Sequence, residues 1–128
     1  MSLPPETSAI LDRFAAAWAS GDPDRVMALM TDDCVYEASV GPEPGTTFRG
    51  AAALRAGLET MFAHDAVART EITDVFAAGD RVAWEWRYYD AAGALVARGC
   101  DLFLLRDGRI ARKNAFRKTA AWPGAGGG

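Results

Sequence analysis

The first half of the chain carries its apolar residues at helical spacing. The first set recurs three and four positions apart, at Ile10, Leu11, Phe14 and Trp18. Residues at this spacing share one face of a helix, so the pattern predicts an amphipathic helix from Pro5 to Ser20.

A second, short helix is predicted by the pair Asp22-Pro23. The aspartate side chain can cap free backbone amides, and proline fits the first helical position. The apolar face of this helix is expected at Val26, Leu29 and Met30. The pair Asp32-Asp33 is expected to end it.

One strand, one loop and a third helix are predicted next. Residues 34–40 alternate between apolar and polar positions, as a strand does. The run from Gly41 to Gly50 is rich in glycine and proline and predicts an irregular loop. A third helix follows, because helical spacing returns at Leu54, Leu58, Met61 and Phe62.

From Ala68 onward the apolar period changes to two, which is typical of strands. Turn residues at Gly79-Asp80, 90–93 and Asp107-Gly108 divide this segment into four strands that pair antiparallel with their neighbours and end at about Lys118. The clearest alternation places apolar or aromatic residues at Val82, Trp84, Trp86 and Tyr88.

Together these elements predict an α+β fold with three helices on one face of a curved antiparallel sheet. The chain has 128 residues, of which 50% are hydrophobic, and this suits one domain with a buried core. We assign residues 1–122 to that domain. Residues 123–128, where glycine dominates, are expected to form a disordered tail.

Charge and hydropathy narrow the classes of partner. The net charge is -3, and Lys and Arg are scattered through both halves, so neither nucleic acid nor a membrane surface is an expected partner. No apolar run approaches the roughly 20 residues that span a bilayer. The first residues lack the basic head and apolar core of a signal peptide, so we expect a cytoplasmic protein.

The sequence offers few residues for metal or cofactor chemistry. Cys34 and Cys100 lack CxxC spacing and are expected to be free, buried thiols. His64 is the only histidine in the sequence, which argues against a metal site. No glycine-rich phosphate loop follows a predicted strand, so no cofactor is expected.

Four short segments resemble one protein family at nearly unchanged spacing: Ala19-Ser20-Gly21-Asp22, Val40-Gly41-Pro42-Glu43-Pro44, Asp101-Leu102-Phe103 and Gly108-Arg109-Ile110. With them, the chain from Ile10 to about Lys118 resembles the cone-shaped α+β barrel of the NTF2-like and SnoaL-like proteins, a cystatin-like fold. Within that superfamily it most resembles ketosteroid isomerase. The resemblance implies a conical cavity that binds a small hydrophobic carbonyl compound, and a homodimer formed through the outer face of the sheet.

The resemblance also implies where a reaction would take place. In ketosteroid isomerases a carboxylate base, a tyrosine and a protonated aspartic acid carry the reaction. By position these become Ala38, Phe14 and Asp101, so only the last keeps its residue type. The resemblance implies that Asp101 is a neutral hydrogen-bond donor to an oxyanion. The residues alone leave open that a nearby cation or the backbone satisfies Asp101 instead.

Two classes of function therefore stay open. One is a cofactor-free isomerase, cyclase or dehydratase, although standard steroid isomerisation is not expected without the base. The other is a non-catalytic ligand-binding or dimerisation module. The epoxide-hydrolase branch of the superfamily needs an arginine two positions before the aspartate, where this chain has Gly99.

Four polar residues are further candidates for the cavity. Glu37 is the only carboxylate near the missing base, but in a regular strand it points opposite to Ala38 unless a bulge re-aims it. Tyr36 shares the parity of Ala38 and could supply a hydroxyl or simply pack. Lys113 and Arg117 face the cavity if the resemblance holds to the last strand. The competing register, which charge patterning favours, instead turns inward Ile110, Asn114 and Phe116.

The apolar wall of the cavity is expected from large side chains that could equally form the core. They are Phe14, Trp18, Met30, Leu58, Phe62, Trp84, Trp86 and Phe103, with Ala38 beside them.

Overall fold

The computed structural model describes residues 3–64 and 69–118. The domain limit expected at residue 122 and the glycine-rich tail lie outside these residues. Helix α1 (Pro5–Ser20) has the predicted bounds. Helix α2 (Pro23–Met27) starts at the predicted cap, where the Asp22 side chain accepts a hydrogen bond of 2.9 Å from the backbone N–H of Asp24.

The first strand begins earlier and ends earlier than predicted. Strand β1 spans Met30–Glu37, so Asp32-Asp33 belongs to a strand and does not end a helix. The cause is pairing with a strand far away in the sequence. The Leu29 carbonyl accepts a hydrogen bond of 2.8 Å from the Ile110 N–H, and Met30 pairs with Ile110. Pairing with a distant strand therefore overrides local helical spacing in this segment.

The predicted loop contains a short strand. Strand β2 (Thr47–Arg49) pairs antiparallel with β1, with Tyr36 opposite Phe48. The expectation of an irregular loop throughout residues 41–50 is therefore wrong for these three residues. The signal was weak because the strand is short and lies at the sheet edge.

The remaining elements follow the prediction. Helix α3 spans Ala51–His64. The four later strands are β3 (Arg69–Ala78), β4 (Arg81–Tyr89), β5 (Leu95–Arg106) and β6 (Arg109–Lys118). Between β5 and β6, Asp107 and Gly108 adopt φ of 53° and 76°. Positive φ at both central residues is the geometry of the two-residue hairpin turn that the Asp-Gly pair predicts.

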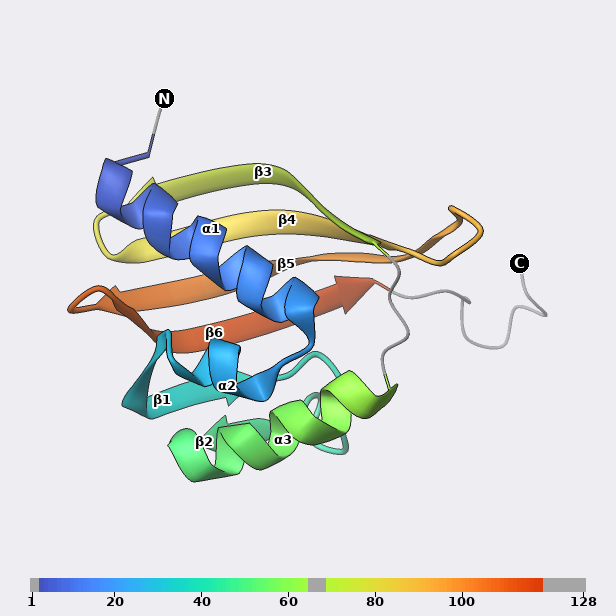
Figure 1. Ribbon diagram of the computed structural model, residues 1–128, viewed down its shortest axis with the longest axis horizontal. Helices are drawn as coiled ribbons and strands as arrows, with labels where there is room; N and C mark the ends of the chain where they lie inside the picture. Colours follow the sequence, from blue (N-terminus) through green and yellow to red (C-terminus); the bar gives the residue numbers. More distant parts are fainter. Residues whose placement is uncertain (1–2, 65–68, 119–128) are drawn as a thin grey trace.

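The six strands form one sheet in the order β2-β1-β6-β5-β4-β3. All neighbouring strands are antiparallel except β1 and β6, which are parallel, so the predicted antiparallel sheet is corrected at this pair. The helices lie on the same side of the sheet, with α1 crossing the later strands and α2 and α3 beside β1 and β2 (Figure 1). The predicted α+β architecture is confirmed.

The core lies between the helices and the concave face of the sheet. Phe14 of α1 is 1% exposed and packs edge-on against Phe103, with ring centres 5.5 Å apart. Leu54 and Leu58 bring α3 into the same cluster. These side chains fill much of the space between the helices and the sheet, so a cavity there is limited in size.

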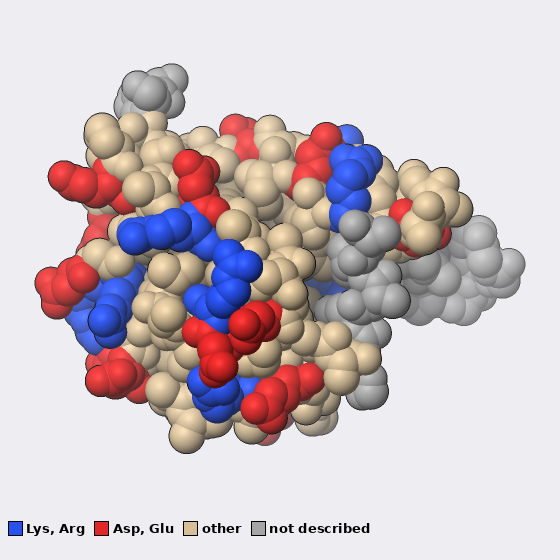
Figure 2. All heavy atoms as spheres, in the orientation of Figure 1, with Lys and Arg blue, Asp and Glu red and all other residues tan. Residues whose placement is uncertain are grey.

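The surface that carries the helices mixes charges of both signs. In Figure 2 basic and acidic side chains lie next to one another on this face. Arg55 of α3 and Asp24 of α2 form an ion pair. Within the described ranges, no helix combines the length and the apolar character needed to cross a membrane.

Candidate functional site

Two adjoining cavities lie between the helices and the concave face of the sheet. The first has a volume of about 110 Å³ and is bounded by α1 and strands β3 and β4. The second has a volume of about 190 Å³ and lies between β1, β6 and α3. Both are smaller than the roughly 300 Å³ at which drug-sized pockets begin, so they suit a single-ring molecule better than a steroid. Five residues line both cavities: Trp18, Trp86, Tyr88, Asp101 and Lys113.

The polar centre of these cavities is a buried pair of opposite charges. Asp101 of β5 and Lys113 of β6 are each 4% exposed, and Lys113 Nζ lies 3.8 Å from Asp101 Oδ2. The same oxygen accepts a hydrogen bond of 2.7 Å from the indole N–H of Trp84. This geometry matches the alternative in which a nearby cation neutralises Asp101.

Lys113 is surrounded by groups that favour its charged form. Its Nζ donates a hydrogen bond of 3.1 Å to the Tyr36 hydroxyl and lies 4.1 Å from the ring centre of Trp18. Burial acts to lower the pKa of Lys113, but the Asp101 carboxylate and Tyr36 outweigh it and raise this pKa above its ordinary value. Lys113 is therefore an ammonium at neutral pH and a strong donor inside the protein.

The orientation of β6 settles the two registers left open by the sequence. Lys113 and Ala115 are buried, and Arg117 lines the second cavity. The register that the charge pattern favours is wrong, because Phe116 is 50% exposed. The alternation fails near Ile110, where β6 is irregular against β5 and two successive residues are buried.

Three buried polar atoms at these cavities have no hydrogen-bond partner within the described residues. They are Asp101 Oδ1, Trp86 Nε1 and Arg117 Nε. All three side chains line the second cavity. Leaving a buried donor or acceptor unpaired costs about 1–3 kcal/mol, so such atoms mark a place where a ligand can supply the missing partner.

Glu37 lies away from both cavities. Its carboxylate accepts a hydrogen bond of 2.6 Å from Nε of Arg112 and forms an ion pair with the same guanidinium. The irregularity in β1 lies before Val35, and pairing with β2 is regular from Val35 to Glu37. Glu37 therefore points to the face opposite to Ala38, which lines the second cavity. From this position Glu37 cannot act as the base that Ala38 replaces.

The predicted wall residues divide into lining and core. Phe14, Trp18, Trp84 and Trp86 line at least one cavity, and Tyr36 and Ala38 line the second. The other four pack in or against the core instead of lining these cavities: Met30, Leu58, Phe62 and Phe103.

Sequence reasoning missed several lining residues. Tyr88 is the most informative of them, because it lines both cavities and shares the strand parity of Trp84 and Trp86, so the alternation contained the signal. Met61 of α3 and Ile72 of β3 were also missed; each lines a cavity and packs against the core.

Gly99 gives Trp86 the space that it occupies. These two residues are paired across β4 and β5. A Cβ atom at Gly99 would lie 2.7 Å from Cζ2 of Trp86 and 2.0 Å from the carbonyl oxygen of Phe116. The indole therefore lies where the arginine of the epoxide-hydrolase branch would begin, and the absence of that arginine is part of how the cavity is built.

The described residues offer little other chemistry. Among them, no three His, Cys, Asp or Glu side chains gather as a metal site would require. Cys34 is buried, Cys100 is half-buried, and both are free. Burial raises the pKa of both thiols, which makes them poor nucleophiles at neutral pH.

Solved structures with the same architecture come from several bacteria. An NTF2-like protein of unknown function from Mesorhizobium loti is 28% identical, with a TM-score of 0.74 over 92% of this chain and 99% of that chain. A candidate SnoaL-like polyketide cyclase from Jannaschia sp. CCS1 is 18% identical, with a TM-score of 0.71 over 92% and 91%. A protein with a cystatin-like fold from Methylobium petroleophilum PM1 is 17% identical, with a TM-score of 0.71 over 94% and 81%.

These likenesses confirm the expected superfamily. The family model of the SnoaL-like domain matches residues 11–113, which include strands β1 to β5 and β6 as far as Lys113. The chain belongs to the SnoaL-like domain family.

Proposed function

We propose that this protein binds a small, largely apolar carbonyl compound in its two adjoining cavities, and that Lys113 donates a hydrogen bond to the carbonyl oxygen. The observation that carries this proposal is the position of the ammonium, which is 4% exposed and lines both cavities. Hydrogen bonds from a charged donor are roughly twice as strong as neutral ones, and more so where water is excluded.

Asp101 takes a different part in this proposal from the one that the resemblance implies. Its Oδ2 atom accepts from Trp84 and faces Lys113, so it serves as the counter-ion that keeps the ammonium in place. The donor to the ligand oxygen is then the lysine, supported by the hydroxyl of Tyr36.

Enolisation of the bound compound is a second candidate, and one observation favours it. Asp101 Oδ1 is buried without a partner in the described part of the chain, close to the ammonium. A carboxylate oxygen beside an electrophilic donor can accept a proton from the carbon next to a carbonyl while the donor stabilises the enolate oxygen. An isomerase, cyclase or dehydratase needs this step.

Binding is tested with acetophenone, by calorimetry and by the shift in melting temperature. The variant Lys113→Met/Asp101→Leu removes both charges together, so that no unpaired charge stays buried, and we expect at least a tenfold loss of affinity. Lys118→Met is the matched control, because this lysine is exposed at the end of the same strand. Equal affinity in the double variant and the wild type would refute the role of Lys113.

We also propose that the protein forms a homodimer through the outer face of the sheet. This face carries exposed apolar side chains on three strands, with Phe76 at 60%, Leu102 at 45% and Phe116 at 50% exposure. Contiguous exposed apolar residues are a common feature of contact surfaces. Light scattering should give a dimer for the wild type and for Leu95→Asp, whereas Leu102→Asp should be monomeric. A monomeric wild type at micromolar concentration would end this proposal.

A further inference from the structure

The second cavity has more positive than negative charge among the residues that are described. Lys113 and Arg117 line it from β6, and Asp101 is the single carboxylate in its described lining. Asp101 lies beside Lys113 and offsets that ammonium, which leaves the charge of Arg117 without a counter-ion at the cavity. A site with this balance favours an anion over a neutral ligand.

Two buried donors come from positions on either side of Gly99 and belong to residues that line this cavity. Trp86 is opposite Gly99 on β5, and Gly99 is opposite Arg117 on β6. The two large side chains therefore flank a residue without a side chain. Cζ2 of Trp86 would lie 2.7 Å from a Cβ on Gly99, and in an indole this atom is attached to the ring carbon that bears Nε1. This edge of the Trp86 indole thus lies close to Gly99.

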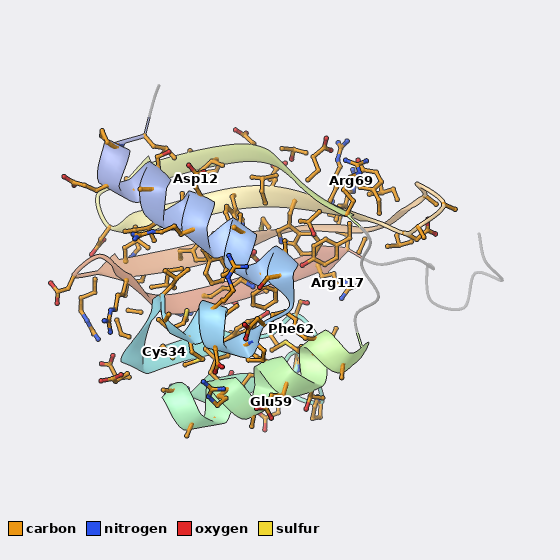
Figure 3. The ribbon with its side chains drawn as sticks, viewed as in Figure 1. Asp12, Cys34, Glu59, Phe62, Arg69 and Arg117 are labelled. Carbon is orange, nitrogen blue, oxygen red and sulfur yellow. The ribbon has the colours of Figure 1, made fainter. Side chains whose placement is uncertain are left out.

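Both donors lack a protein acceptor. Trp86 Nε1 and Arg117 Nε are buried and have no hydrogen-bond partner in residues 3–64 and 69–118. Trp86 is 5% exposed, so this indole N–H is not satisfied by open solvent. The guanidinium carbon of Arg117 lies 5.8 Å from the ring centre of Tyr88, which helps to hold the group at the cavity wall. Figure 3 shows Arg117 near the carboxyl-terminal end of β6.

We propose that these donors bind a carboxylate, and that the ligand of this protein is a small single-ring carboxylic acid. This inference rests on the proposed function and names its ligand class. A carboxylate has two oxygens, one for the indole N–H and one for the guanidinium, and it supplies the negative charge that the cavity lacks. The ring lies against apolar residues of the same cavity, namely Ala38, Met61 and Ala115. A carbonyl on that ring would reach Lys113.

The test compares three probes of similar size in calorimetric titrations of the full chain at neutral pH. Benzoate and benzamide differ only in charge and in one donor group, and acetophenone carries the carbonyl alone. We expect benzoate to bind at least tenfold tighter than benzamide. Equal affinities of benzoate and benzamide for the wild type would overturn the carboxylate inference without any variant.

Two variants then locate the carboxylate. Arg117→Gln should lower the affinity for benzoate at least tenfold and that for acetophenone by a clearly smaller factor. Trp86→Phe keeps a ring and removes the N–H, and it should lower the affinity for benzoate several-fold. Arg112→Gln is the control, because this arginine lies on the same strand and pairs with Glu37 on the outer face. Unchanged benzoate binding in both Arg117→Gln and Trp86→Phe would refute the assignment.

If acetophenone binds through Lys113 while benzoate is not preferred, the carboxylate inference fails alone. If no probe binds, the proposed function fails with it.

Discussion

The buried pair of Asp101 and Lys113 allows a quantitative prediction for stability. Their charged atoms are 3.8 Å apart, and both residues are 4% exposed. With an effective dielectric constant of about 20, Coulomb's law gives an attraction of about 4 kcal/mol at this distance. Removing one partner leaves the other charge buried and unpaired, which costs about 3–5 kcal/mol in proteins. Lys113→Met and Asp101→Leu should each lower the free energy of unfolding by about this amount.

The double variant separates this explanation from a simple packing effect. Lys113→Met/Asp101→Leu removes both charges and keeps apolar volume, so it should be more stable than either single variant, with a coupling energy of roughly 3 kcal/mol. Urea unfolding followed by circular dichroism measures it, because each single variant should lose roughly 2 M in midpoint at a slope of about 2 kcal/mol/M.

The exposed pair Arg55 and Asp24 is the matched control for this cycle. Its side chains are 47% and 73% exposed, so solvent screens their charges and no comparable coupling is expected. Strict additivity of the two single changes at Asp101 and Lys113 would refute the reasoning. It would mean that the two charges do not depend on each other in the folded protein.

Three further predictions follow from the same geometry. Gly99→Ala should lower the free energy of unfolding by about 1–3 kcal/mol, because the new Cβ would clash with the Phe116 carbonyl and the Trp86 indole. Urea unfolding measures this loss, and an unchanged stability would contradict the close contact. Burial raises the pKa of the Cys34 thiol above its ordinary 9.0, so the neutral thiol stabilises the fold below that pH. The urea midpoint should therefore decline above about pH 9, and less so in Cys34→Ala. The wild type should not detectably isomerise a 3-oxo-Δ5-steroid, because the cavities are small and Arg112 holds Glu37 away from them. Ready turnover of this steroid would refute the prediction.

Local chemistry was enough to predict most of the secondary structure. The bounds of α1, the Asp22 cap and the Asp107-Gly108 turn depend on residues close in sequence, and each has the predicted place. The prediction failed where distant pairing decides the outcome. Met30 looked helical from its neighbours, but it forms a strand because Ile110 of β6 pairs with it. Strand β2 was missed because it lies at the sheet edge and pairs with β1 alone among the described strands.

The chain alone determined the family, the fold class and the aromatic character of the cavity, because apolar spacing, turn residues and short segments are properties of neighbouring residues. The tertiary structure decided which polar groups enter the cavity. For Lys113 the sequence left both orientations open, because the resemblance placed it inside and the solvent preference of charge favoured the outside. The irregularity near Ile110 accompanies the inward orientation of Lys113. There Asp101, Tyr36 and the Trp18 ring, from three other elements, make a buried ammonium stable. No spacing rule contains those contacts, because the groups that balance a buried charge come together only when the sheet has formed.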